Sequence, residues 1–155
     1  MNSTRVSQHI RAARPAIYRA LLDAGAIAKW RVPAGMTSHV HEFDAREGGS
    51  FRVSLTYDAP ESAGKSTAHT DTYHGHFLKL VPNEQVVEVI EFETTDPAFG
   101  GTMTMTTTLT DTDDGTDVLV VHESIPDGVS PADNEAGTRM ALGHLAQLVE
   151  AAERS

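Results

Sequence analysis

Hydrophobic and polar residues alternate over residues 49–57, and this alternation predicts a β-strand with one buried face. A second strand is predicted just before it, over residues 37–44. Gly48 and Gly49 stand between the two strands and supply the turn, because glycine can adopt the positive φ angles that a tight reversal needs. The buried face of the later strand is expected to consist of Phe51, Val53, Leu55 and Tyr57.

Further runs of β-branched and aromatic residues, separated by turn residues, predict the rest of a sheet. Additional strands are expected at residues 4–11, 70–81, 85–93, 102–111 and 117–123. Six strands between residues 37 and 123, joined mostly by short turns, favour one continuous antiparallel sheet. The small and polar residues at 61–69 are typical of a mobile loop.

Helical spacing of apolar residues predicts two short helices and one long one. The short helices are expected over residues 16–22 and 26–30, after the first strand. The long helix follows a cap at either Ser130 or Asp133, and roughly 20 residues at about 1.5 Å each extend for about 30 Å, enough to cross a sheet. Its apolar face is expected to consist of Thr138, Ala141, Leu142, Leu145, Leu148, Val149 and Ala152.

A strongly curved sheet that wraps a long helix is hard to fill completely, so we expect a ligand cavity between the two. Met103, Met105 and Tyr57 lie on the expected inner face, and unbranched, polarizable methionines suit a wall that adapts to a ligand. The alternative is that the methionines fill irregular gaps in the core. Trp30 is either a lid over the cavity or a packed anchor for the second short helix.

Composition narrows the classes of partner. The chain has 155 residues, which favours a single domain spanning residues 1–155. Its net charge of -10 opposes nucleic acid and anionic membrane surfaces as partners. No cysteine is present, so neither a disulfide framework nor a thiolate metal site is expected. No apolar run approaches the roughly 20 residues of a membrane span, and we expect a cytoplasmic protein without a cofactor.

Two H-x-H pairs are the first candidates for chemistry. His39 and His41 form one pair, and His74 and His76 form the other. Since residues two apart in a strand share a face, Phe43 on the buried face is expected to place the first pair there as well. A strand between the pairs keeps them about 10 Å apart, too far for one zinc ion with bonds of about 2 Å, so no metal site is predicted. The histidines are interpreted either as polar lining of the cavity or as surface groups.

Acid or base catalysis needs a titratable group placed against a reacting atom. The candidates are His41, His76, His122, Tyr57, Tyr73, Glu88 and Glu91. The buried face of residues 85–93 stays open, because hydrophobic residues occupy both parities there. The sequence contains no nucleophile elbow, phosphate-binding glycine loop or HExxH motif. Asp44 and Arg46 flank the first turn and are expected to fix it by local hydrogen bonds.

The order of the predicted elements resembles the helix-grip fold of the START-like, or Bet v 1-like, superfamily. Within it the chain is similar to the SRPBCC proteins of the group named after the activator of the Hsp90 ATPase (AHSA1-like). The resemblance covers about residues 5–152 and is carried by residues 17–21 with Trp30, EFDAREGGSFRV, His74-Gly75, residues 80–84, Gly115-Thr116, and Gly137 with Leu142, Leu145 and Leu148. It implies an α+β fold with a curved antiparallel sheet of about seven strands around a long C-terminal helix.

Two positions depart from the pattern of this group. The group usually has tryptophan directly after the glycine of the last helix, where this chain has Thr138. It often has a second aromatic residue after the first tryptophan, where this chain has Arg31. Both changes remove ring surface near the cavity, so its size and its ligand are expected to differ from those of its relatives.

The resemblance implies a deep apolar cavity, because members of the superfamily bind lipids, sterols or polyketides, or act as cyclases. Our first hypothesis is a protein that binds a small apolar or aromatic molecule. The alternatives are a cyclase or hydrolase that uses a cavity histidine, and a co-chaperone-like interaction module, although a free-standing domain need not touch Hsp90. Exposed edges at the first and last strands offer a route to a homodimer. The cavity is expected to be lined by Trp30, His41, Phe43, Phe51, Val53, Tyr57, His74, His76, Met103, Met105, Ala141 and Leu145.

Overall fold

A computed structural model describes residues 2–33, 35–57 and 70–154 of the chain. The elements are β1 (Asn2–Ile10), α1 (Arg14–Leu21), α2 (Ala24–Trp30), β2 (Met36–Phe43), β3 (Ser50–Tyr57), β4 (Thr70–Val81), β5 (Gln85–Phe92), the 3₁₀ helix η1 (Pro97–Phe99), β6 (Thr102–Thr112), β7 (Gly115–Ile125) and α3 (Pro131–Arg154). The predicted α+β helix-grip architecture is confirmed. The loop expected at 61–69 lies outside the described residues.

The sheet brings its first and last strands in sequence together. Its seven strands follow the order β1-β7-β6-β5-β4-β3-β2, and every neighbouring pair is antiparallel. The edges of the sheet are therefore β1 and β2, because β1 adds to β7 and covers the edge that the last strand was expected to expose.

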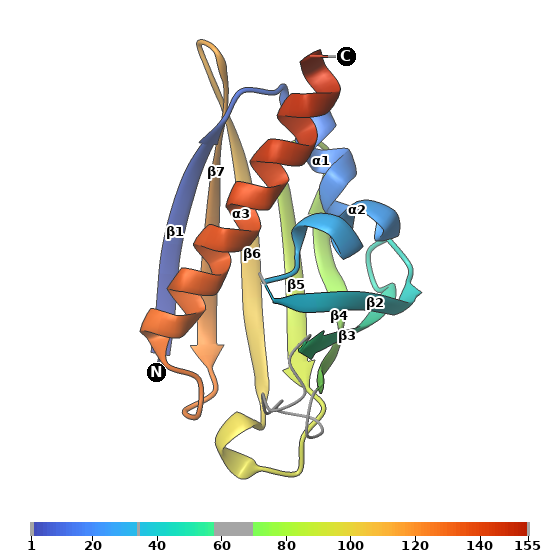
Figure 1. The fold of residues 1–155 in the computed structure, drawn as a ribbon, viewed down its shortest axis with the longest axis vertical. Coiled ribbons are helices and arrows are strands. Elements are labelled where there is room, and N and C mark those ends of the chain that lie inside the picture. Colours follow the sequence, from blue (N-terminus) through green and yellow to red (C-terminus); the bar gives the residue numbers. More distant parts are fainter. Residues whose placement is uncertain (1, 34, 58–69, 155) are drawn as a thin grey trace.

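Helices α1, α2 and α3 all lie on one side of the sheet, and α3 crosses it obliquely (Figure 1). In this view β2 runs across the molecule whereas β5, β6 and β7 run along it, so the sheet curls around the helical side. Among the strands, α3 packs mainly against β1, and it also contacts α1 and α2. The helix therefore lies toward one edge of the concave face, which leaves room over the middle strands.

The turn between β2 and β3 is fixed as its sequence suggests. Gly48 has a φ of +81°, and Arg46 Nε donates to Asp44 Oδ2 at 2.8 Å, which agrees with the structural role expected for both charged residues. The turn is also attached to β4, because Gly48 N–H donates to the carbonyl of Phe77 and Phe77 N–H donates to that of Gly49. The turn at Gly48 and Gly49 thus connects β2 and β3 and fixes both to β4.

Two N-terminal caps and the buried indole of Trp30 fix the positions of α2 and α3. Asp23 accepts from two backbone N–H groups at the start of α2, and Ser130 Oγ accepts from Asp133 N–H at the start of α3. Trp30 is 2% exposed, and its Nε1–H donates to the carbonyl of Ala20 at 2.9 Å. The ring therefore anchors the end of α2 against α1, and this contact fixes where the next residue, Arg31, leaves the helix.

A β-bulge in β2 reverses the faces of the residues before it. Val40 pairs with Val53 and Glu42 pairs with Arg52, so His41 is the extra residue between two consecutive partners on β3. Phe43 still faces inward, but the inward set before the bulge is Met36, Ser38 and Val40. The expectation that Phe43 places His39 and His41 on the buried face fails for this reason.

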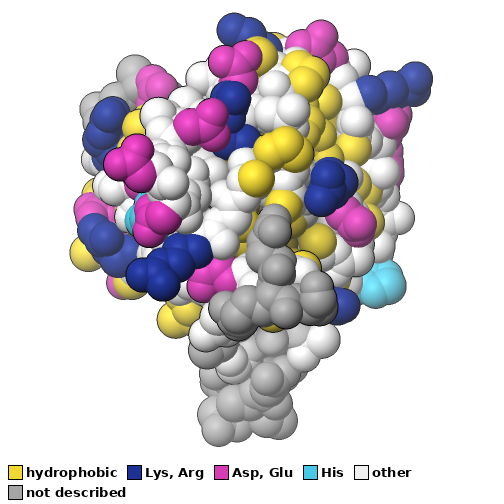
Figure 2. Space-filling view, turned by 90° about the horizontal axis from the view of Figure 1, so that it is seen from above, with side chains coloured by type: hydrophobic (Ala, Val, Ile, Leu, Met, Phe, Trp, Pro, Cys, Tyr) yellow, Lys and Arg dark blue, Asp and Glu magenta, His cyan; other side chains and the backbone are white. Residues whose placement is uncertain are grey.

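The acidic surplus of the chain does not form one patch on the face seen from above, where acidic and basic side chains are interspersed (Figure 2). Charges of opposite sign also pair between segments far apart in the sequence, as in the bonds from Arg52 to Glu93 and from Arg14 to Asp111. None of the helices in the described ranges combines the length and hydropathy of a membrane span.

Candidate functional site

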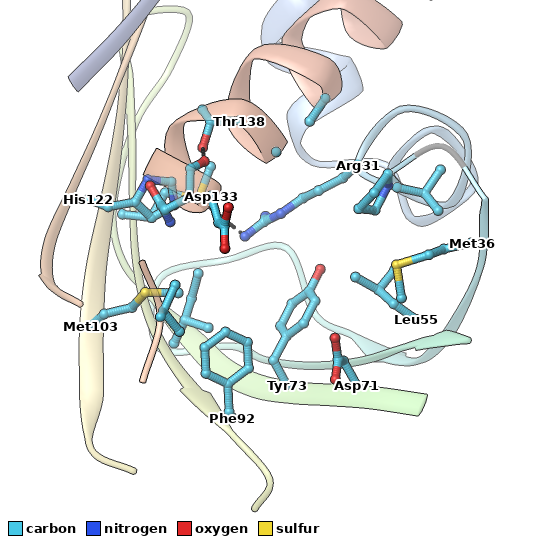
Figure 3. A pocket seen from close by; sticks show the side chains of 18 of the residues that line it. Arg31, Met36, Leu55, Asp71, Tyr73, Phe92, Met103, His122, Asp133 and Thr138 are labelled. Carbon is cyan, nitrogen blue, oxygen red and sulfur yellow. Dashed lines mark hydrogen bonds between the residues drawn. The ribbon is translucent and has the colours of Figure 1, made fainter. Parts of the chain in front are cut away.

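A cavity of about 730 Å³ lies between the inner face of the sheet and the first half of α3 (Figure 3). Much of its wall is apolar or aromatic, with contributions from the end of α2, from strands β2 to β7, and from α3. The apolar wall includes Trp30, Val32, Met36, Leu55, Ile90, Phe92, Met103, Met105, Val120, Val129 and Leu142. Its residues come from six strands, two α-helices, the 3₁₀ helix η1 and the loops between them, so only the completed fold assembles it.

The cavity is open partly because α3 presents small residues to it. Gly137, Thr138 and Ala141 all line the cavity. A Cβ atom placed on Gly137 would meet no described atom within 4 Å beyond the helix backbone itself, so this side of the helix faces empty space. The hydroxyl of Thr138 donates to the carbonyl of Asn134 at 2.7 Å and is therefore satisfied within the helix.

A buried ion pair lies at the side of this cavity. Arg31 Nη1 donates to Glu88 Oε1 at 2.7 Å, and the side chains of Arg31 and Glu88 are only 15% and 6% exposed. The second Nη contacts Met105 Sδ at 3.2 Å, and the guanidinium carbon lies 5.5 Å from the centre of the Tyr73 ring. Burial alone would lower the pKa of Arg31, but the adjacent Glu88 carboxylate outweighs it and raises that pKa above its ordinary value. Arg31 is therefore a fixed cation whose charge Glu88 balances.

Two neutral polar groups complete the inner wall. Tyr73 and His122 are 7% and 6% exposed, and within the described part of the chain the Tyr73 hydroxyl and His122 Nδ1 have no hydrogen-bond partner. Burial raises the pKa of Tyr73, against the opposing effect of Arg31. Burial, followed by the charge of Arg31, lowers the pKa of His122 to about 4. Both side chains are thus uncharged at neutral pH.

Carboxylates also reach the cavity at two places. Asp71 lines it from β4 and is buried, whereas Asp133 lines it from the first turn of α3 and is exposed. Figure 3 shows the Arg31 side chain extending across the cavity, with the Tyr73 ring on one side and His122 on the other. The polar side chains of the cavity are therefore surrounded by a mainly apolar wall.

The structure divides the expected lining residues into three groups. Trp30, Tyr57, Met103, Met105 and Ala141 line the cavity. The second group lies in the packed core: Phe51, Val53 and Leu145 are buried, and Phe43 is half-buried with its ring edge-to-face against Phe77.

The third group, the histidines expected inside, lies on the outer face of the sheet. His41 is displaced by the bulge, and its Nε2 is 2.7 Å from Ser54 Oγ. His74 and His76 point outward because Tyr73 and Gly75, which alternate with them along β4, pair with the inward residues of β3. His74 contacts Glu91 and Glu93 at 3.1 and 3.0 Å. No group of three or more potential ligands suited to a metal ion occurs among the described residues.

Sequence reasoning did not assign Arg31 or Asp71 to the cavity wall, and it left open whether Glu88, a catalytic candidate, faces inward. Arg31 stood out only as a departure from a family pattern, and nothing local connects it with Glu88. The open parity of β5 is resolved by burial, because Val86, Glu88 and Ile90 are all buried and therefore face inward. Asp71 could have been placed by alternation with Tyr73 along β4.

Comparison with known proteins places this geometry in a family. The sequence matches the model of the family described as Activator of Hsp90 ATPase homolog 1-like protein over residues 11–150. No functionally curated protein matches the sequence with significance.

Solved structures give the same result. A crystal structure of a protein from Chromobacterium violaceum is 32% identical, with a TM-score of 0.84, over 97% of this chain and 99% of that one. A protein from Rhodobacter sphaeroides (19% identity, TM-score 0.77, 96% and 93% coverage) shares the fold. An AHSA1-like protein from Aeromonas hydrophila, solved by NMR, shares it as well (18%, 0.74, 99% and 96%). With the family model matching most of its length, the chain belongs to the family of Activator of Hsp90 ATPase homolog 1-like proteins.

Proposed function

We propose that this protein binds a small, mainly apolar or aromatic molecule in the cavity between α3 and the sheet. The observation that carries the proposal is the volume of about 730 Å³ behind an apolar wall, since ligand pockets typically measure about 300–1,000 Å³. Membership of a family with a ligand-binding type of fold supports the same conclusion.

The chemistry of the wall also favours a binding role. Apolar surface removed from water contributes about 25 cal/mol per Å², so rings and methyl groups supply most of the affinity. Met36, Met103 and Met105 line the cavity, and their flexible thioethers can adapt to the shape of a ligand. The absence of side-chain bulk at Gly137 leaves space that a ligand can occupy.

Use of the same cavity as an enzyme would depend on His122, the histidine that lines it. A general base is most effective when its pKa lies near the working pH. Burial lowers the pKa of His122 to about 4, so its ring is uncharged but only weakly basic at neutral pH. Binding is therefore the function that the geometry supports best.

The proposal is tested by titrating the protein with pyrene, an apolar fluorescent probe, and by blocking the cavity with Thr138→Trp. Because Thr138 lines the cavity, the larger indole should occupy the space and weaken pyrene binding by about tenfold or more. Gln147→Trp places the same ring on the exposed face of α3 and should leave binding unchanged.

The outcome is read after circular dichroism and thermal unfolding have shown that both variants fold. Absence of pyrene binding to the parent protein, or equal binding by the Thr138→Trp variant, would contradict a ligand site in this cavity. Native mass spectrometry of the freshly purified protein provides a second measurement, in which a retained small molecule is expected.

A further inference from the structure

Four of the polar side chains in and behind the cavity wall form a cluster without net charge. We call Arg31, Glu88, Tyr73 and His122 the polar cluster. Arg31 and Glu88 cancel each other through their 2.7 Å ion pair. Tyr73 and His122 are buried and neutral. The cluster therefore offers hydrogen bonds but no unbalanced charge.

Two atoms of this cluster need a partner that the described residues do not supply. They are the Tyr73 hydroxyl and His122 Nδ1, and both belong to side chains that line the cavity. Buried polar atoms in folded proteins nearly always form hydrogen bonds, because leaving one unmade costs free energy. A phenol hydroxyl can donate or accept, and a neutral imidazole nitrogen can do either, according to its tautomer. A ligand oxygen suits both positions.

Charged ligands of either sign lose hydration when they enter this mainly apolar cavity. An anion that approaches Arg31 finds the guanidinium already paired with Glu88, and it passes the Asp133 carboxylate at the rim. A cation meets Arg31, which stays protonated, beside the carboxylates of Asp71 and Asp133. Burial of either ion adds a desolvation cost that a neutral molecule avoids.

The geometry points to an uncharged ligand: a mainly apolar molecule that carries a hydroxyl or carbonyl oxygen, hydrogen-bonded to Tyr73 or His122. This inference rests on the proposed binding function and names the class of ligand. The carbon skeleton occupies the apolar wall, and the oxygen selects among molecules of the same shape. Tyr73, His122 and the Arg31–Glu88 pair are then the specificity-determining residues.

Four probes with the same ring system test this assignment: pyrene, 1-pyrenemethanol, 1-pyrenecarboxylate and 1-pyrenemethylammonium, each titrated by fluorescence at neutral pH. The alcohol should bind about tenfold more tightly than pyrene, because its hydroxyl satisfies a buried partner. The carboxylate and the ammonium compound should each bind more weakly than the alcohol, by about tenfold or more.

Substitutions at single residues test which side chains produce this order of probe affinities. Tyr73→Phe removes only the hydroxyl and should reduce the preference for 1-pyrenemethanol over pyrene by about fivefold, while Tyr18→Phe, on α1 and outside the cavity, should not. Glu88→Gln keeps the shape of the side chain but leaves the charge of Arg31 unbalanced. It should therefore raise the affinity for 1-pyrenecarboxylate by about tenfold.

The results separate the two proposals. Equal affinity for pyrene and its alcohol, or tightest binding of either ion by the parent protein, overturns the assignment of a neutral oxygen-bearing ligand and leaves the binding function intact. Failure of all four probes to bind overturns the binding function itself. If Glu88→Gln does not fold, the Tyr73→Phe comparison still decides the question, because it changes no charge.

Discussion

At the scale of single residues, the buried ion pair between Arg31 and Glu88 has a large effect on stability when one partner is removed. The two groups are 57 positions apart in sequence, and each has lost most of its hydration. Such a pair contributes little net stability, but removing one partner leaves the other charge buried and uncompensated.

We predict that Arg31→Met destabilises the protein by about 3–5 kcal/mol, whereas the double variant Arg31→Met with Glu88→Leu recovers most of that loss. Urea unfolding at neutral pH measures both. The matched control is Arg52→Met, which breaks the exposed pair with Glu93 on the outer face and should cost about 1 kcal/mol or less. Equal costs for Arg31→Met and Arg52→Met would show that the inner pair is not desolvated.

His122 gives the protein a predictable weakness in acid. Its pKa falls from 6.5 to about 4 on folding, so between these values the unfolded chain binds a proton that the folded chain rejects. Stability contributed by the neutral ring is complete above pH 6.5 and is lost as the pH falls toward 4, by about 3 kcal/mol in total.

The measurement is the free energy of unfolding at pH 7 and pH 4.5, compared between the parent protein and His122→Phe. The variant should lose less stability between the two pH values, whatever its stability at pH 7. His76→Gln, at an exposed position of β4, should follow the parent protein. Carboxylates such as Glu93, whose pKa is lowered chiefly by its hydrogen bond from Arg52, contribute equally to all three proteins.

At the scale of elements, α3 combines a packed face with an unfilled one. Leu142, Leu145 and Val149 are buried as their spacing predicted. Gly137 and Gly143 instead face open space, because a Cβ atom added at either position would meet no described atom within 4 Å beyond the helix backbone. Glycine inside a helix costs roughly 0.5–1 kcal/mol relative to alanine.

Gly137→Ala and Gly143→Ala should therefore each stabilise the protein by about 0.5–1 kcal/mol, which corresponds to about 1–4 °C in the midpoint of thermal unfolding. Gly143 serves as the control, because it does not line the cavity. Stabilisation by Gly143→Ala together with destabilisation by Gly137→Ala would mean that the space above Gly137 is already occupied.

The strands show where reasoning from sequence stops at this scale. Alternation located them to within a few residues, but it assigns faces only while each strand pairs residue for residue. The extra residue His41 breaks that count in β2, and no local signal marks it, since its neighbours have ordinary strand composition. The same problem arises for Glu88 in β5. Hydrophobic residues occur on both faces of this strand, so the sequence does not show which face is buried.

At the scale of the whole molecule, the order of elements was sufficient to predict the architecture, because few folds accommodate that order. The family was predicted from motif residues, above all those around Gly48 and Gly49. The cavity lining was harder to predict. It depends on where α3 lies across the sheet, and that position follows from contacts with β1, α1 and α2 rather than from the helix itself. Phe51 and Leu145 therefore became core residues, while Arg31 and His122 came to face the empty volume.

The pairing of β1 with β7 has a consequence for biosynthesis. Ile10 pairs with Thr116 and Asn2 with Ile125, so β1 has its neighbour only after these later residues have been translated. At about 5–20 residues per second, the nascent chain waits on the order of ten seconds before this strand can join the sheet. Residues 116–125 must therefore leave the ribosome before β1 can take its place in the sheet.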